Sequence, residues 1–393
     1  MWNNRCKVAV SGVGFSKKTR TDEVHLAEHA LTAVKAAVED SGLKLTDIDG
    51  LATFPELRGG GGRIPLVDGV SHVSVNCMLA MLKLPNPRWH IQGETVNIGG
   101  AFQQAANAIL AGVCNYAVIW RAMHNRRAPY YGLTRENAAG PRQFSEPYGF
   151  SGPGGMSIAY MRYLELYGQQ REKMATLAVT QRKHANKNPN AHFYKTPLTV
   201  EEYLDSRMIS HPFCLYDCDI PVQAAYAMVL TTAERARDLK PKPAYLAGYG
   251  QRMVYNGEGM IDSLEDWMAG TKSSAPLTWE KSGLGPKDVD VAQIYDGFSS
   301  SVIYGLEGYG FCGEGETLDF IQDGRIELDG ELPLNTFGGS LSDGRMHGIG
   351  HLVEGVLQAT GRAGERQVKN VEVSFVGASM TQATTFVFVP NPY

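Results

Sequence analysis

The stretch Ser41-Gly-Leu-Lys-Leu-Thr-Asp47-Ile-Asp49 occurs a second time in this chain, as Ser282-Gly-Leu-Gly-Pro-Lys-Asp288-Val-Asp290. The first copy closes a segment that has apolar residues on one helical face, for which Gly42 is the expected C′ residue. A short apolar strand is expected after each copy, at 50–54 and at 291–295. The chain therefore repeats one unit of secondary structure.

Further pairs of similar segments extend this repeat in the same order along both halves. The matched segments are 8–14 with 246–250, the helices 101–111 with 352–360, and the strands 116–120 with 371–375. Chance similarity between two strand–helix units is the alternative, but the constant offset between the matched aspartates favours duplication. We expect an α/β protein of two similar halves, with mostly parallel sheets covered by helices.

Residues 121–220 differ in composition from both halves. They are rich in Tyr, Arg, Asn, Pro and Gly, and they predict one helix, at 157–167. Long insertions between regular elements commonly form lids or binding regions. The expected organisation is a first half of residues 1–120 with 221–240, an inserted loop or lid region at 121–220, and a second half at 241–393.

Composition narrows the class of protein. Of the 393 residues, 43% are hydrophobic and 20% are charged, and the net charge is −4, which is typical of a soluble globular protein. No basic stripe indicates nucleic acid, no apolar run of about 18 residues indicates a membrane span, and the polar N-terminus does not resemble a signal peptide. Six scattered cysteines favour a cytoplasmic protein with reduced thiols. Cys214 and Cys218 form half of a metal-site pattern without a second ligand pair, so we expect no metal site.

Two segments are expected to start helices at one common crevice. They are Asn97-Ile-Gly-Gly100 in the first half and His347-Gly-Ile-Gly350 in the second. A helix N-terminus carries free N–H groups and the positive end of the helix dipole, which suit an anion or an enolate oxygen. Gly99, Gly100 and Gly348 would let a ligand approach the backbone. Ligands of α/β proteins bind beyond the carboxyl ends of strands, so we expect a carbonyl substrate whose oxygen gains negative charge.

Several separated motifs carry a resemblance to a known family. Those in the second half read Tyr295-Asp-Gly-Phe298, Leu306-Glu-Gly-Tyr-Gly-Phe-Cys312 and Leu334-Asn-Thr-Phe-Gly-Gly339, and the insertion adds 182–191 and 217–221. In this order they resemble the thiolase superfamily, and in particular the sterol-carrier-protein-type branch of thiolase-like lipid-transfer proteins. The resemblance covers nearly the whole chain and implies the thiolase fold, whose layers alternate as αβαβα.

The reactive thiols of a thiolase are absent from the matching positions. Asn97 stands where the family carries its nucleophilic cysteine, and the segment 374–378 holds no second cysteine. Cys114 follows a helix end and Cys312 belongs to a Gly-Phe-Cys motif, so neither replaces the missing thiols. Acyl-enzyme formation needs an activated nucleophile, so ordinary thiolysis is not expected.

The chain instead resembles the cysteine-less aldolases of steroid side-chain degradation. This implies retro-aldol cleavage of a β-hydroxyacyl-CoA, such as a 17-hydroxy steroid acyl-CoA, to a ketone and a shorter acyl-CoA such as propanoyl-CoA. It implies coenzyme A as part of the substrate and no covalently bound cofactor. It also implies a homodimer and a small partner protein with an OB fold and a zinc ribbon. A retro-aldol step needs a base, an oxyanion site and an acid rather than a nucleophile.

Four side chains are candidates for this chemistry. Tyr295 ends a core strand, in a motif where the aldolases carry a catalytic tyrosine; because tyrosine ordinarily has a pKa of about 10, it would need help to act as a base. His347 stands at the family's Gly-His-Pro histidine and could bind the thioester oxygen or move a proton. His351 would share its helix face, and Asp296 could orient Tyr295 or a histidine. Each side chain has a packing or capping role as its alternative.

One position departs from the aldolase pattern. The aldolases carry a second tyrosine in His-Gly-Tyr-Gly, where this chain has Ile349, which can take no part in proton transfer. Either His351 or another polar residue compensates, or the substrate and mechanism differ. Two other hypotheses stay open: a cysteine-less acyltransferase or Claisen-type enzyme, and a non-catalytic scaffold subunit that binds acyl-CoA. His124, Asn125, Tyr130 and Tyr131 are candidates to line a substrate tunnel, with packing at a dimer interface as the alternative.

Overall fold

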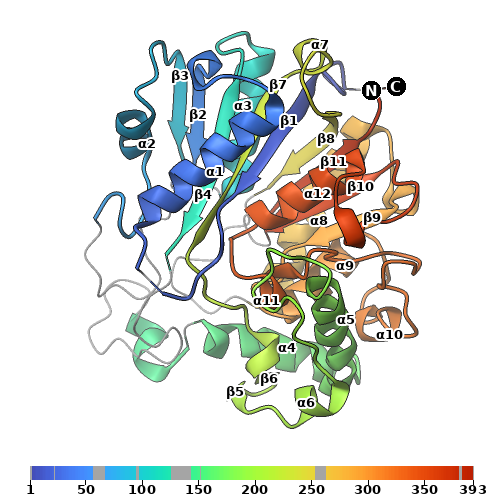
Figure 1. The fold of residues 1–393 in the computed structure, drawn as a ribbon. Helices are drawn as coiled ribbons and strands as arrows, with labels where there is room; N and C mark the ends of the chain where they lie inside the picture. The colour runs from blue at the N-terminus through green and yellow to red at the C-terminus, as the bar shows by residue number, and fades with distance from the viewer. Residues whose placement is uncertain are drawn as a thin grey trace.

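A sheet of nine strands runs through both halves of the molecule, in the order β3-β2-β4-β7-β1-β8-β11-β10-β9. Figure 1 shows the strands of the two halves side by side, with the insertion below their ends and the two termini close together. The computed structural model describes residues 2–21, 23–55, 67–93, 97–124, 143–150, 152–252, 263–379 and 383–392. Of the candidate tunnel residues, Asn125, Tyr130 and Tyr131 lie outside these ranges.

The strands are short and mostly buried, as expected for strands that helices cover. In chain order the sheet contains β1 (Val8–Phe15), β2 (Gly50–Thr53), β3 (Trp89–Gln92), β4 (Ala117–Met123), β7 (Ala224–Thr232), β8 (Ala244–Gln251), β9 (Val291–Ile294), β10 (Ser374–Ser379) and β11 (Thr384–Val389). A separate antiparallel pair lies in the insertion, formed by β5 (Met208–Ser210) and β6 (Phe213–Cys214).

Helices occur in both halves and in the insertion. The first half has α1 (Leu26–Ser41), α2 (Val75–Leu82) and α3 (Ile98–Leu110). The insertion has α4 (Pro153–Leu166), α5 (Ala175–Ala185) and α6 (Val200–Leu204), and α7 (Ala233–Ala236) follows β7. The remainder has α8 (Leu264–Ser282), α9 (Ser300–Gly308), α10 (Thr317–Phe320), α11 (Gly339–Ser342) and α12 (Ile349–Thr360). Within the described ranges, none of these helices is long and apolar enough to cross a membrane.

The repeated sequence forms the same hydrogen bonds twice. Asp49 accepts two backbone N–H groups just before β4, and Asp290 accepts two just before β10. Asp47 and Asp288 each accept the N–H group three residues earlier in the chain. The predicted C′ residue Gly42 ends α1 with φ of 79°. The two copies therefore close equivalent turns, and the predicted duplication is confirmed.

The Gly-x-Gly sequences of β1 and β8 also have equivalent surroundings. A Cβ atom at Gly12 would lie 2.3 Å from the carbonyl oxygen of Ala37 in α1. A Cβ atom at Gly248 would lie 2.7 Å from that of Thr278 in α8. Glycine is needed at both positions because a helix backbone packs directly on the strand.

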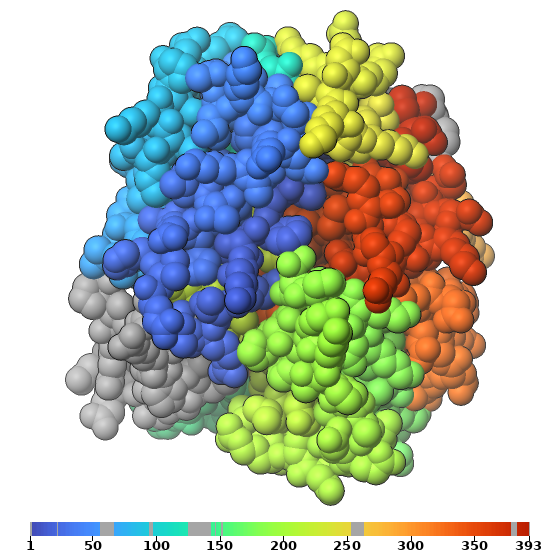
Figure 2. Space-filling view, viewed as in Figure 1, coloured from blue at the N-terminus to red at the C-terminus, as the bar shows by residue number. Residues whose placement is uncertain are grey.

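The alternation of side chains along the strands divides the core into layers. Buried side chains of β7 alternate between a cluster with α1 and a cluster with α3 and α12. Those of β11 alternate between the cluster with α3 and α12 and a third cluster with α8 and α9. Because successive side chains of a strand point to opposite faces, the layers follow the predicted order αβαβα. Figure 2 shows the two halves in contact above the insertion.

The prediction of mostly parallel sheets is wrong. Only the pairs β2–β3, β2–β4 and β9–β10 are parallel among the described strands. The strands β7 and β11 return antiparallel to their neighbours, and β1 and β8 join the halves by antiparallel pairing. Strands covered by helices on both faces are continuously apolar in either direction, so their sequences do not reveal strand direction.

Several predicted boundaries shift by a few residues. The helices predicted at 101–111 and from 352 begin earlier, at Ile98 and Ile349, because their first turns are glycine-rich and have little helical periodicity. The strand predicted at 371–375 begins at Ser374, because Asp290 binds the N–H groups just before it. The insertion contains α5, which was not predicted. The division of the chain at 120, 220 and 240 stays a prediction.

Candidate active site

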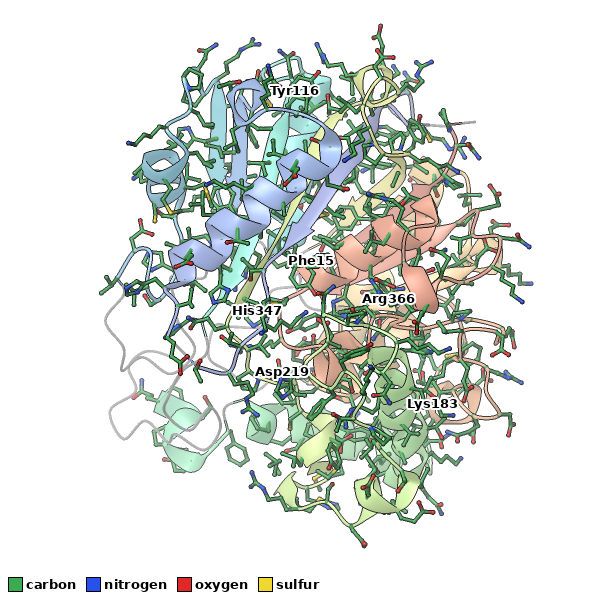
Figure 3. All side chains as sticks on the ribbon, in the orientation of Figure 1. Phe15, Tyr116, Lys183, Asp219, His347 and Arg366 are labelled. Atoms are coloured by element: carbon green, nitrogen blue, oxygen red, sulfur yellow. The ribbon has the colours of Figure 1, made fainter. Side chains whose placement is uncertain are left out.

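Predicted site residues from both halves lie near the carboxyl ends of β4, β9 and β10. Tyr295 follows β9, and Gly348 packs on Ala378 of β10, whose carbonyl oxygen would lie 2.5 Å from an added Cβ. The carboxyl ends of strands are where α/β proteins bind ligands. Figure 3 places His347 near the middle of the molecule, just below strands of the first half.

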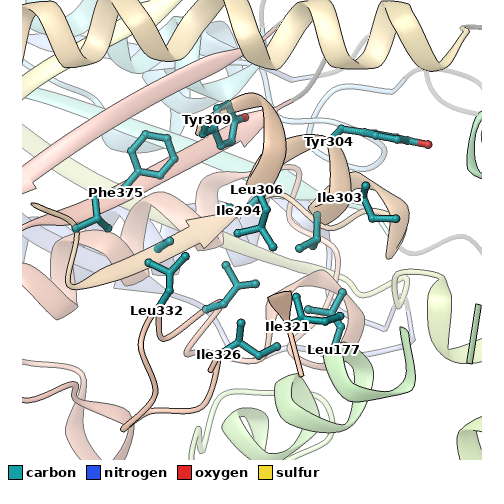
Figure 4. Close-up of a cluster of buried hydrophobic side chains, with 14 of the residues drawn as sticks. Leu177, Ile294, Ile303, Tyr304, Leu306, Tyr309, Ile321, Ile326, Leu332 and Phe375 are labelled. Carbon is teal, nitrogen blue, oxygen red and sulfur yellow. The ribbon is translucent and has the colours of Figure 1, made fainter. Parts of the chain in front are cut away.

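A buried apolar cluster fixes the end of β9. Ile294 packs there with residues of α9, α10 and α5 (Figure 4). Asn335 holds the backbone of Ile294 as a neighbouring strand would, with Oδ1 2.7 Å from its N atom and Nδ2 2.8 Å from its O atom. The next two residues, Tyr295 and Asp296, therefore leave the strand from a rigid point.

The side chain of Asn97 is the cap of α3. Its Oδ1 atom accepts the N–H group of Gly99 over 2.8 Å and the hydroxyl group of Thr384 over 3.2 Å. The backbone carbonyl of Asn97 accepts the N–H group of Gly100 over 2.9 Å. The N–H groups of Gly99 and Gly100 in the first turn of α3 thus donate to Asn97. A substrate oxygen would have to displace Asn97 to bind them.

The side chain of Thr384 occupies the space that a side chain at position 99 would need. A Cβ atom there would lie 2.1 Å from Oγ1 of Thr384. Gly348, the N-cap residue of α12, has a φ of 89°, a left-handed conformation that favours glycine. At this helix the first α-helical bond runs from Leu352 to Gly348, so the N–H groups of Gly350 and His351 precede the helical ladder. These N–H groups make the start of α12 better suited than that of α3 to bind an oxyanion.

Asp296 and His351 form a buried pair. His351 is 1% exposed and its Nε2 atom lies 2.9 Å from Oδ1 of Asp296, which is fully buried. The same carboxylate accepts the N–H groups of Ser340 and Leu341 at the start of α11, over 2.7 and 3.4 Å. With Nε2 donating to Asp296, Nδ1 of His351 carries a lone pair. No described residue hydrogen-bonds this buried Nδ1 atom.

Tyr295 lies directly beside this pair. The ring centroids of Tyr295 and His351 are 5.8 Å apart, and Tyr295 is half-buried. A Cβ atom at Gly297 would lie 2.5 Å from the Tyr295 hydroxyl oxygen. The glycine of the Tyr-Asp-Gly motif therefore leaves the space that the tyrosine ring occupies.

A buried arginine that the sequence did not single out contacts His347. Arg121 of β4 is 0% exposed, and its Nη2 atom lies 2.9 Å from Nδ1 of His347. A guanidinium group only donates hydrogen bonds, so Nδ1 of His347 is the acceptor. The sequence signal was a charged residue inside an apolar strand segment, which is rare without a partner or a function.

Ile349 is a core residue and does not line the site. It is fully buried in one cluster with Ile98, Met123 and Met346. Since Ile98 and Ile349 are the first residues of α3 and α12, the two helix starts converge on the same core. The side chain at position 349 stabilises that convergence and supplies no proton.

Cys114 and Cys312, the two cysteines considered as replacements for the missing thiols, do not provide a nucleophile. Burial raises the pKa of Cys114 and of Cys312, each to about 12. The thiolate is the reactive form of cysteine, so both thiols are inert near neutral pH. Among the described residues, no cluster of three or more His, Cys, Asp or Glu side chains could hold a metal ion.

Comparison with known proteins identifies the family. A family profile described as Thiolase C-terminal domain-like matches residues 257–389. Over 90% of its length the chain is 34% identical to the 17-hydroxy-3-oxo-4-pregnene-20-carboxyl-CoA lyase of Mycobacterium tuberculosis, of which it covers 92%. The chain belongs to the thiolase superfamily. It is also 34% identical to the steroid side-chain-cleaving aldolase of Thermomonospora curvata, over 90% of each chain. Within the superfamily this protein is thus an aldolase, and the predicted resemblance is confirmed.

Solved structures agree with this family. The Ltp2-ChsH2(DUF35) aldolase superposes on this aldolase with a TM-score of 0.86 and 29% identity, over 98% of both chains. Human mitochondrial 3-ketoacyl-CoA thiolase superposes with a TM-score of 0.67 at 12% identity, a level that shows the common fold alone. The predicted thiolase fold is therefore confirmed.

Proposed function

We propose that this aldolase cleaves a β-hydroxyacyl-CoA between its α and β carbons, releasing a ketone and a shorter acyl-CoA. Loss of the β-hydroxyl proton allows the carbonyl group to form, and the bonding electrons pass to the thioester as an enolate. The proton that left the β-hydroxyl group is returned to the enolate α carbon, so the cleavage balances without consuming water or free coenzyme A. The coenzyme A is part of the substrate, and no covalently bound cofactor takes part.

Two observations together carry this proposal. Asn97 is engaged as the cap of α3, and the acid–base side chains Tyr295, His351 and Asp296 lie together. Asn97 uses its oxygen to cap α3, so the thiolase nucleophile position serves the fold. Tyr295, His351 and Asp296 stay together within ring contact and hydrogen-bonding distance. General acid–base chemistry without a covalent intermediate fits this set of groups.

Each residue has a proposed role. Tyr295 takes the β-hydroxyl proton while Nδ1 of His351 receives the tyrosine proton, and Asp296 holds His351 through Nε2. His347, with the N–H groups at Gly350 and His351, stabilises the thioester oxygen as it gains charge. Position 349 needs no tyrosine in this scheme, because His351 handles the proton.

The relatives support a steroid substrate. Two of them are named for steroid side-chain cleavage or for a 17-hydroxy pregnene carboxyl-CoA. By analogy, the substrate of this aldolase is a 17-hydroxy steroid side-chain acyl-CoA, and propanoyl-CoA is the shorter product.

A homodimer and a small partner protein complete the proposal. Among the described strands, β3 has β2 as its one neighbour, and Trp89 and Ile91 on it are half-buried. An apolar edge strand is suited to pairing with a second copy of the chain. The similar solved aldolase is named for two components, Ltp2 and ChsH2(DUF35), which supports a small partner protein. The family resemblance alone implies an OB fold and a zinc ribbon in that partner.

The substitution Tyr295→Phe tests the proposed chemistry. We expect turnover of a 17-hydroxy steroid acyl-CoA to fall by about 10²- to 10⁴-fold, the usual range for loss of a general base, with acyl-CoA affinity nearly unchanged. Tyr116→Phe is the matched control, because Tyr116 lies at the opposite end of the strands (Figure 3). Unchanged turnover in Tyr295→Phe would contradict the scheme, and acyl-CoA binding without cleavage in the wild type would favour a scaffold subunit.

A further inference from the structure

The contact between Arg121 and His347 determines which ring nitrogen of the histidine carries its hydrogen. We infer that Arg121 is a positioning residue that holds His347 as a neutral hydrogen-bond donor through Nε2. The inference rests on the proposed function, in which His347 binds the thioester oxygen. It goes further by excluding the second role considered for His347, that of a proton carrier.

The guanidinium group is fixed by the ends of two parallel strands. Its Nη1 atom donates to the carbonyl oxygen of Phe54, directly after β2, and Cζ lies 4.9 Å from the Phe54 ring centroid. Arg121 itself belongs to β4, which pairs with β2. With its side chain fully buried, Arg121 presents Nη2 to His347 from a rigid base.

The backbone of His347 is held in an uncommon conformation. Its φ angle is 47°, in the left-handed region that non-glycine residues seldom adopt. Such a conformation persists where the surrounding contacts determine it, and it is frequent at functional sites. The bond from Arg121 to Nδ1 is one such contact, and it orients the imidazole ring.

The chemistry of the two groups fixes the tautomer. Arginine has five N–H donors and no acceptor, so Nδ1 of His347 must offer its lone pair. The neutral ring then carries its hydrogen on Nε2. Protonating Nδ1 would place an N–H group against an N–H donor over 2.9 Å, which is repulsive.

This arrangement separates the tasks of the two histidines. His347 remains a hydrogen-bond donor. The hydrogen bond that it accepts at Nδ1 polarises the ring and makes Nε2–H a stronger donor. A neutral imidazole is a very weak acid, so it donates a hydrogen bond to a developing oxyanion without transferring its proton. Proton transfer is left to Tyr295 and His351. The Nδ1 lone pair of His351 has no hydrogen-bond partner among the described residues.

The test is the ¹⁵N spectrum of the histidine rings in the full-length protein, recorded without substrate. The His347 signals are assigned by their loss in His347→Gln. In the wild type we expect a protonated Nε2 and an unprotonated Nδ1 that stay unchanged from pH 6 to 8. In Arg121→Met we expect the His347 ring to titrate or to mix tautomers, whereas Arg121→Lys, which keeps a donor, should retain the wild-type pattern.

Kinetics supply the second readout. Arg121→Met should lower kcat by about 10- to 100-fold with KM within threefold, a loss of the size expected when one oxyanion donor is misplaced, and Arg121→Lys should recover part of it. Arg162→Met, which removes an exposed arginine paired with Glu265, is the control. A His347 ring that titrates in the wild type, or that is unchanged in a folded Arg121→Met variant, overturns the inference. Because the spectra need no turnover, failure of the aldolase proposal would be seen separately, in the cleavage assay.

Discussion

Nε2 of His351 lies 2.9 Å from Oδ1 of Asp296, and both side chains are shielded from solvent. The carboxylate is fixed by two backbone N–H groups at the start of α11. Its hydrogen bond therefore restricts rotation of the His351 ring. Gly339 is part of this arrangement, because a Cβ atom there would lie 2.0 Å from Oδ2 of Asp296. The His351 ring is thereby kept beside Tyr295.

Removing the histidine should abolish proton transfer without unfolding the protein. In His351→Phe the ring volume and the edge-to-face contact with Phe337 persist, while both nitrogens are lost. We expect turnover to fall at least about 100-fold, as for other general acid–base groups, with acyl-CoA affinity within a few-fold. Steady-state kinetics and calorimetric binding measure both quantities. A folded variant that retains a tenth of wild-type turnover would remove His351 from the mechanism.

The glycine after Asp296 offers a test in which no proposed catalytic residue is itself substituted. A Cβ atom in Gly297→Ala would lie 2.5 Å from the Tyr295 hydroxyl oxygen, so the tyrosine ring must move. We expect kcat to fall by about 100-fold, because displacement by about 1 Å is that costly. Gly155→Ala is the matched control, since its nearest atom is 3.8 Å away. Equal activity of the two variants would mean that the position of Tyr295 does not matter.

Substitutions at position 97 distinguish a cap from a substrate ligand. Serine is as good an N-cap as asparagine, so Asn97→Ser should keep stability and turnover within a few-fold. Asn97→Ala should lower the free energy of unfolding by about 1 kcal/mol, because the cap of α3 is lost. Urea denaturation and turnover are measured on both variants. A stable but inactive Asn97→Ser protein would show that the amide group contacts the substrate.

His184 should make the protein less stable in mild acid. Burial lowers the pKa of this histidine from 6.5 to about 4, and its Nδ1 atom faces the carbonyl oxygen of Asn335, which supports β9. Between these two values the unfolded chain binds a proton that the folded chain does not, so stability falls as the pH drops from 6.5 toward 4. The loss should be on the order of 3 kcal/mol when complete.

Denaturation with urea at pH 7.5 and pH 4.5 measures this loss. In His184→Gln the difference between the free energies of unfolding at the two pH values should be smaller than in the wild type, by roughly the contribution of His184. His25→Gln is the control, because His25 is exposed and should leave the pH dependence as in the wild type. An undiminished pH dependence in His184→Gln would contradict the assignment.

Repeated local sequence was sufficient to predict the duplication of the fold. The paired aspartates at 47 and 288 predicted equivalent turns, and hydrogen bonding at each copy agrees with that prediction. Strand direction was not predictable, because it depends on how β7 and β11 return through the sheet rather than on their apolar composition. Distant parts of the chain decide such pairing.

Residues of the candidate site could be predicted only where they belong to a sequence motif or have a regular spacing from one. Tyr295 and His351 follow from motif and spacing, but the bond between His351 and Asp296 joins residues 55 positions apart. Arg121 escaped prediction because its partner, His347, is 226 positions away, and because its strand is otherwise apolar. That Asn97 stands at the nucleophile position of a thiolase stays a prediction. Its bond to Thr384 was not predictable, because it depends on the packing of β11 against α3.

The most direct test of the central claim is the product balance of a single cleavage reaction. The protein, with and without a small OB-fold partner, is mixed with a 17-hydroxy steroid acyl-CoA, and the products are quantified by mass spectrometry in the absence of free coenzyme A. Retro-aldol cleavage predicts equal amounts of ketone and shortened acyl-CoA, with no acyl group attached to the protein. Cleavage that requires free coenzyme A, or an acylated side chain on the protein, would contradict it.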